Sequence, residues 1–287
     1  MSSAFEKEAI RSPVVAGQFY PRSADALRQA IEEAFLAPLG PGALPQVAPT
    51  RSSDRLFGMV VPHAGFQYSA QAAAWAFAAM ARFGKPEAVV LLGVNHRGVG
   101  ASIAVSPARG WQTPCGVMPV AQQLVVELQD LDNAVCSDAF AHAAEHSLEV
   151  EIPFLQYLFG ALDVLPLVLG HVSPQEIETL GTALATLAAT HDLVFVASSD
   201  FSHYISAEQA RYLDMQAIQM ITSIAPQGLL DVVQAKRISM CGIIPVAVML
   251  VAAQKMGITR GKLLHYHTSG DVTGDQHDVV GYAAIVL

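Results

Sequence analysis

The chain contains 287 residues, of which 52% are hydrophobic and 14% charged, and its formal net charge is −9 at pH 7. This length and composition allow a large buried core, arranged as one big domain or two ordinary ones. The negative charge and the scattered basic residues argue against nucleic acid as the main partner, because a phosphate-binding surface needs clustered Lys and Arg.

The first predicted elements follow a surface loop. Residues 37–50 are rich in Pro, Gly and Ala, as is typical of a loop. A strand is predicted over 55–63, a helix over 69–83 with Ser69 as its N-cap, and a buried strand over 87–96.

The rest of the chain continues this alternation of apolar strands and helices. Further helices are predicted over 119–130, 145–158, 174–190, 206–223 and 242–256, and further strands over 163–169, 192–199, 263–269 and 279–287. Continuous apolar strands between helices indicate an α/β fold with a mostly parallel or mixed sheet covered by helices on both faces. The last two strands are expected to be antiparallel, at the sheet edge. No break in composition divides the chain, so we predict a single domain over residues 1–287.

Two features concern the cellular setting. The apolar run 238–254, which carries no charged residue, is shorter than the roughly 20 residues that cross a bilayer, and we predict a buried helix and no membrane partner. The N-terminus lacks the basic start and apolar stretch of a secretory signal. Three cysteines form no even disulfide framework, which favours a reducing, cytoplasmic setting.

Polar side chains stand at the ends of three predicted strands. His63 and His96 each end a strand, Asp200 follows the strand over 192–199, and His203 comes three residues later. Ligands of open α/β sheets bind beyond the carboxyl ends of the strands. We therefore expect these residues to line a site, with Asp200 and His203 as acid/base groups or as partners of metal ligands.

Cys241 adds a thiol at the start of a predicted helix, where the helix dipole is expected to lower its pKa. His63, His96 and Cys241 would then supply two imidazoles and one thiolate. Three protein ligands leave a coordination position open, as in catalytic metal sites. A thiolate suits iron(II), copper or zinc and does not suit magnesium. The alternative is two ordinary histidines and an inert buried thiol.

Three neighbouring residues can support such a site. Glu145 and His146 can reach it, and Glu145 can orient a metal-bound histidine. The alternative for Glu145 is an acidic residue in the first turn of a helix. Asn95 either holds the turn before His96 or contacts a ligand.

His265 and His267 alternate along the predicted strand 263–269, so both side chains are expected on one side. We predict a solvated strand face with Tyr266 packed inward. A pair of metal ligands is the alternative.

Short motifs spread over nearly the whole chain resemble those of the Memo family, also called the AmmeMemoRadiSam system protein B family. The matching motifs are RSPVVAGQFYP at 11–21, PHAGFQYS at 62–69, GVNH at 93–96, EHSLEVEIPFLQ at 145–156, SSDFSHY at 198–204, MCG at 240–242, TSGDVTGD at 268–275 and VGYAA at 280–284. Each motif alone is weak, but their joint occurrence in this order is specific.

The resemblance implies a fold similar to that of class III extradiol dioxygenases, which are non-haem iron enzymes that open catechol rings. It also implies a metal pocket of two histidines and a cysteine, with an aspartate and a further histidine nearby. These correspond to His63, His96, Cys241, Asp200 and His203. Iron(II) is the first expected cofactor, and copper or zinc can replace it. The expected partners are an AMMECR-type protein and a radical SAM enzyme, with a small molecule or a peptide as ligand.

Three functions remain open at this stage. The first is a redox-active metalloprotein, an oxygenase in which His203 acts as acid or base. The second is a binding or signalling module that reuses the pocket without turnover. The third is a metal-free hydrolase with Cys241 as nucleophile, His203 as base and Asp200 as orienting residue.

Overall fold

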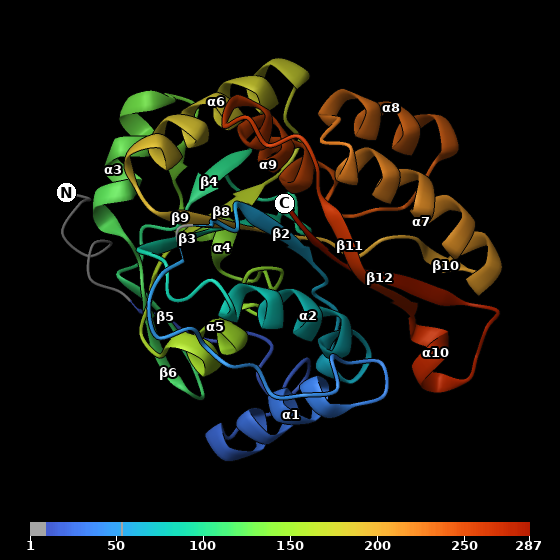
Figure 1. Ribbon diagram of the computed structural model, residues 1–287. Helices are drawn as coiled ribbons and strands as arrows, with labels where there is room; N and C mark the ends of the chain where they lie inside the picture. Colours follow the sequence, from blue (N-terminus) through green and yellow to red (C-terminus); the bar gives the residue numbers. More distant parts are fainter. Residues whose placement is uncertain (1–9, 53) are drawn as a thin grey trace.

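The structure is a computed structural model that describes residues 10–52 and 54–287 (Figure 1). The strands are β1 (Ile10–Arg11), β2 (Gly58–Val61), β3 (Ala88–Val94), β4 (Ile103–Val105), β5 (Gly110–Thr113), β6 (Gly116–Pro119), β7 (Cys136–Ser137), β8 (Asp163–Leu169), β9 (Leu193–Ser198), β10 (His203–Ile205), β11 (Lys262–Thr268) and β12 (Val279–Val286). The helices are α1 (Ala24–Leu36), α2 (Phe66–Ala81), α3 (Gln122–Leu131), α4 (Ala139–His142), α5 (Ile152–Phe159), α6 (Pro174–Thr190), α7 (Ala207–Thr222), α8 (Pro226–Lys236), α9 (Ile243–Lys255) and α10 (Ser269–Thr273).

The main sheet is mixed, with strand order β10-β12-β2-β9-β3-β8-β4-β7 and with β11 paired to β12. Its centre, β2-β9-β3-β8, is parallel, and Leu91 of β3 pairs with Val196 on one side and Pro166 on the other. These strands are almost entirely buried, in keeping with their continuous apolar sequences. A separate sheet joins β1, β5 and β6.

Helices cover both faces of the main sheet (Figure 1). On one face, α2 packs against β2, β11 and β12, and α1 and α5 pack against α2. On the other face, α9 packs against β3, β8 and β9 and is covered by α6 and α8. The helix α9 is apolar all round, because it lies between the sheet and a further layer of helices. The predicted α/β architecture with helices on both faces is confirmed.

Two predicted helix starts are wrong. The helix α2 begins at Phe66 with Gly65 as its N-cap; Ser69 lies inside it, with its hydroxyl donating to the Ala64 carbonyl. The helix predicted from residue 145 begins at Ile152; residues 145 and 146 are irregular, and residues 147–151 form turns. Two carboxylates of this segment accept backbone N–H groups from other parts of the chain, which holds the segment out of a regular helix.

The two C-terminal strands are antiparallel as predicted, but only β11 lies at an edge. The strand β12 pairs with β2, β10 and β11 and is therefore internal. The expected solvated face of β11 is also wrong. His267 is 1% exposed, and its Nε2 lies 2.8 Å from the Tyr68 carbonyl. His265 stacks on Trp75 of α2, so α2 covers this face.

Within the described residues, no helix is both long and apolar enough to cross a membrane. The run 238–254 instead forms the buried helix α9 and the turn before it. The extent of the domain, 1–287, stays a prediction, and its residues 1–9 and 53 lie outside the described part.

Candidate metal centre

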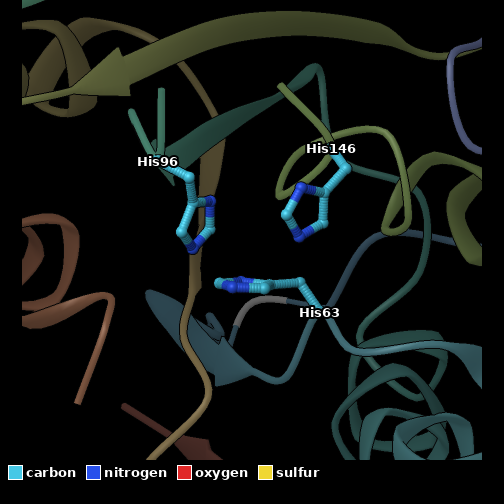
Figure 2. Close-up of side chains that lie close together, drawn as sticks. All are labelled: His63, His96 and His146. Atoms are coloured by element: carbon cyan, nitrogen blue, oxygen red, sulfur yellow. The ribbon is translucent and has the colours of Figure 1, made fainter. Parts of the chain in front are cut away.

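Three histidines converge where the central strands end (Figure 2). His63 follows β2, His96 follows β3, and His146 comes from the turn before α5. One ring nitrogen of each lies within 4.8 Å of the other two, so this group can hold a metal ion. Because β2 and β3 are parallel and both neighbour β9, their carboxyl ends deliver the two rings to one crevice.

His63 is held by the neighbouring strand. Its Nδ1 lies 2.8 Å from the Ser198 hydroxyl at the end of β9, and its Nε2 lies 3.3 Å from the Cys241 sulfur. The ring is buried, and burial followed by the nearby imidazoles lowers the pKa of His63 well below 6.5. The ring is therefore neutral, which is the form that binds metals.

His96 is anchored by Glu145. Its Nδ1 lies 2.9 Å from one carboxylate oxygen of Glu145, and its backbone N–H donates to the other at 2.8 Å. The same carboxylate accepts the N–H groups of His146 and Ser147. Burial alone would raise the pKa of Glu145, but these bonds outweigh it and lower the pKa to about 2. A carboxylate on Nδ1 leaves Nε2 for a metal, as in many metal sites.

The sequence analysis expected that His146 can reach the site but did not count it among the metal ligands, whereas the structure places its ring in the cluster. Its ring stacks on His96 at 4.8 Å between centroids and contacts Phe19 on another side. A helix over 145–158 would have pointed residues 145 and 146 about 100° apart. The turn instead brings the Glu145 carboxylate and the His146 ring to the same place, and the spacing of residues in the sequence does not predict this arrangement.

Cys241 and Asp200 lie beside His63. The Cys241 sulfur accepts the backbone N–H of Asp200 at 3.2 Å, and the Asp200 carboxylate accepts the backbone N–H of His63 at 2.8 Å. The expected low pKa of the thiol is wrong: burial and then the Asp200 charge raise the pKa of Cys241, although the residue precedes α9. Burial also raises the pKa of Asp200 to about 6.

The other two predicted site residues make mainly structural contacts. The Nδ1 of His203 lies 2.9 Å from the Ser239 carbonyl, so it carries the proton of that hydrogen bond. Asn95 donates its amide to the Val99 carbonyl at 2.7 Å and holds the turn before His96. A thiol hydrolase would need the Cys241 sulfur next to His203 as its base. The sulfur instead faces His63, and His203 Nδ1 is bonded to the Ser239 carbonyl, so this arrangement is not formed.

A cavity of about 560 Å³ lies between the segment 17–21, α1 and α2. Its wall includes Phe19, whose ring packs against His146. Polar groups in the same wall are Gln18, Glu33 and Gln71, of which Gln71 has a buried, unpartnered side-chain oxygen among the described residues. A small organic molecule or a peptide side chain fits such a space.

The donor set fits a transition metal. Two imidazoles present Nε2 while Nδ1 is hydrogen-bonded, and a third imidazole and a thiol lie alongside. Fold and site thus define an α/β protein with a histidine cluster that can hold a metal ion at the carboxyl ends of parallel strands.

Comparison with known proteins assigns the family. The family model described as "Memo-like protein" matches residues 11–286. A MEMO1 family protein of Methanopyrus kandleri is 41% identical over 280 residues, covering 96% of this chain and 98% of its own. One from Thermotoga sp. strain RQ2 is 39% identical over 279 residues, covering 96% and 99%. The chain belongs to the Memo family.

A solved structure supports the fold alone. An uncharacterized protein from Escherichia coli K12 superposes with a TM-score of 0.53 at 15% sequence identity. The match covers 81% of this chain and 100% of that one.

Proposed function

We propose that the protein is a redox-active metalloprotein that binds non-haem iron(II), or copper, through His63, His96 and Cys241, and that it acts on a small organic substrate. The observation that carries this proposal is the convergence of ring nitrogens within 4.8 Å, with Nδ1 of His63 and of His96 anchored by hydrogen bonds. His146 is the competing third ligand, because it belongs to the same cluster.

The metal, when bound, supplies redox chemistry and an open coordination position. The residues of the chain do the rest. Burial keeps His63 neutral, and Glu145 fixes the ring of His96. Asp200, whose pKa lies near 6, can hold or release a proton beside His63. Phe19 shields His146 on the side of the cavity, which limits access of water there.

A second function is favoured by the cavity itself. Its volume and its mixed aromatic and amide wall suit a peptide side chain, and a non-catalytic binding module would use it without turnover. An AMMECR-type protein and a radical SAM enzyme are the partners we propose, on the strength of family membership. The three free cysteines fit a reducing, cytoplasmic setting.

The test of the metal proposal is metal content after anaerobic purification, measured by inductively coupled plasma mass spectrometry. His63→Ala and His96→Ala are expected to lose at least nine-tenths of the bound metal. Removal of a hydrogen-bond partner of a metal ligand typically weakens metal binding roughly 10- to 100-fold, and removal of the imidazole ligand itself should weaken it more. His277→Ala, at an exposed loop position, is the matched control and should keep full occupancy. Full occupancy in both cluster variants would contradict the proposal.

Cobalt(II) identifies the third ligand. A thiolate ligand gives an intense sulfur-to-cobalt absorption, which should vanish in Cys241→Ser and persist in His146→Ala. The opposite pattern, with no sulfur band in the unmodified protein and loss of cobalt from His146→Ala, would assign the position to His146. Turnover separates the two functions: a catechol consumed only by the iron-loaded protein supports the oxygenase, and ligand binding without consumption supports the binding module.

A further inference from the structure

We infer that Glu151 is a neutral carboxylic acid that positions His63 for metal binding through the Ser198 hydroxyl. Glu151 is a positioning residue, two residues removed from the metal along a chain of hydrogen bonds. The inference rests on the proposed function for its purpose, but the protonation pattern that it describes exists without any metal.

The geometry is a single hydroxyl with three close partners. The Ser198 oxygen lies 2.8 Å from His63 Nδ1, 2.8 Å from the Ser147 carbonyl oxygen and 2.9 Å from a carboxyl oxygen of Glu151. All four residues are buried, with Ser147 and Ser198 fully covered and Glu151 1% exposed. Water therefore does not take the place of any of these partners.

The number of hydrogens available to the Ser198 hydroxyl and its partners limits which of them can donate. A hydroxyl carries one hydrogen and two lone pairs, and a backbone carbonyl can only accept. One assignment leaves no buried group without a partner: the Ser198 hydrogen goes to the Ser147 carbonyl, and the two other partners donate to the Ser198 oxygen. His63 does so with Nδ1–H, and Glu151 does so with a carboxylic O–H. An ionised Glu151 would face a hydroxyl whose only hydrogen is already used, so one buried acceptor would be left without a hydrogen.

The surroundings of Glu151 support the neutral form. Burial raises the pKa of Glu151 well above its ordinary value; the hydrogen bond with Ser198 acts in the opposite direction, and the negative charge of Asp200 adds to the rise. The preceding glutamates of the same turn differ. Glu149 pairs with Arg11 at 2.7 Å, and Glu145 accepts several N–H groups that lower its pKa.

The consequence concerns the other nitrogen of His63. With the proton on Nδ1, the Nε2 atom is a bare lone pair, and it is the atom that faces the Cys241 sulfur. The ring is thus set in the metal-binding tautomer before a metal arrives. Glu151 and Ser198 play for His63 the part that Glu145 plays for His96, with a neutral acid in place of a carboxylate.

The tautomer and the acid can be observed in the metal-free protein. Nitrogen-15 NMR of histidine-labelled protein should give His63 the pattern of a neutral ring with Nδ1–H, assigned by its loss in His63→Ala. Infrared difference spectra between the unmodified protein and Glu151→Gln should show one carbonyl band of a protonated carboxylic acid. A carboxylate band in that difference, or a His63 ring protonated at Nε2, would overturn the inference.

Two variants test positioning. Ser198→Ala and Glu151→Leu should each lower the affinity for cobalt(II) about 10- to 100-fold and redistribute the His63 tautomer. Glu151→Gln keeps a donor to Ser198 and should retain the cobalt(II) affinity and the His63 tautomer. Glu178→Gln, at an exposed side chain on α6, is the control. If Glu151→Leu fails to fold, Glu151→Gln and the NMR measurement still decide. If His63 shows the Nδ1–H tautomer but the protein binds no metal, the proposed function is contradicted and this inference stands. If the protein binds metal but metal-free His63 carries its proton on Nε2, this inference is contradicted and the proposed function stands.

Discussion

At the scale of single residues, the turn 145–151 carries three buried glutamates with three different partners. Glu145 holds backbone N–H groups and His96, Glu149 holds Arg11 and the N-terminal segment, and Glu151 holds Ser198. Identical side chains thus differ in charge because some of their partners donate hydrogen bonds or carry a positive charge and others do not. Sequence spacing alone cannot separate them, since the donors come from distant parts of the chain.

Loss of the Glu145 charge should weaken the metal centre without unfolding the protein. Glu145→Gln keeps the shape but gives His96 Nδ1 a neutral, weaker acceptor and places an NH2 group against the backbone N–H of His96, so the affinity for cobalt(II) should fall about 10- to 100-fold. Equilibrium titration measures this. Glu208→Gln, an exposed glutamate in the first turn of α7, removes the same charge and should leave the affinity unchanged. Equal losses in both variants would assign the effect to net charge rather than to the hydrogen bond.

Glu149 should matter for stability. Its carboxylate accepts Arg11, the N–H groups of Val14 and Val15, and the Tyr20 hydroxyl. Glu149→Leu leaves the buried Arg11 without its counter-charge, so the free energy of unfolding should fall by about 3–5 kcal/mol in urea.

The matched control for this change is the exposed pair of Lys255 with Glu178, whose side chains are 46% and 49% exposed. Glu178→Gln should cost less than about 1 kcal/mol, because water screens an exposed pair. A similar cost for Glu149→Leu would show that the N-terminal segment is held by its apolar contacts instead.

At the scale of elements, the sequence predicts best where periodicity and packing agree. The helix α6 and the strand β8 have the predicted bounds, because an apolar face and clear end signals such as Ser173 and Pro174 define them. The helix α1, the helix α8 and the short strands β4 to β7 were not predicted. The strand-end residues His63 and His96 were found because their place follows from the sheet, whereas His146 depends on a turn fixed by tertiary hydrogen bonds.

The close approach of α9 to β9 gives a prediction at this scale. A Cβ atom on Gly242 would overlap the Ser198 carbonyl oxygen and the Ser199 side chain, and backbone cannot move away cheaply. Gly242→Ala should therefore lower the free energy of unfolding by about 1–3 kcal/mol and disturb the cobalt(II) spectrum through Cys241.

A helix-interior glycine provides the comparison. A Cβ atom on Gly228 of α8 would meet the flexible end of Met220 at 2.9 Å, which can move. Gly228→Ala should be neutral or stabilise the protein by up to about 1 kcal/mol, because alanine favours helix. A larger loss for Gly228→Ala than for Gly242→Ala would contradict the packing argument.

At the scale of the whole molecule, one histidine links three elements far from the metal centre. His191, at the end of α6, lies 2.8 Å from Glu87 before β3 and 3.0 Å from Glu127 of α3. Both ring nitrogens face carboxylates, so both must donate and the ring is protonated. The hydrogen bond to Glu87, against a smaller effect of burial, raises the pKa of His191 above 6.5.

This pair of contacts makes stability depend on pH. A raised pKa in the folded state adds stability that is fully present below pH 6.5 and is lost as pH rises through the raised value. In urea unfolding, the unmodified protein should exceed His191→Gln in stability at pH 6, and the difference should shrink by pH 9. The difference is expected to be small, since the side chains are partly exposed. A gap that widens with pH would reverse the assigned protonation.

The place of β2 between β9 and β12 has a consequence for biosynthesis. Both edges of this apolar strand stay unpaired in the nascent chain until segments translated much later emerge from the ribosome. Exposed strand edges of this kind can pair with strands of other chains, so chaperones are expected to bind the partly synthesised chain and prevent its aggregation. Because His63 reaches its place only when those late strands have arrived, a metal held by His63 is expected to bind after synthesis and not during it.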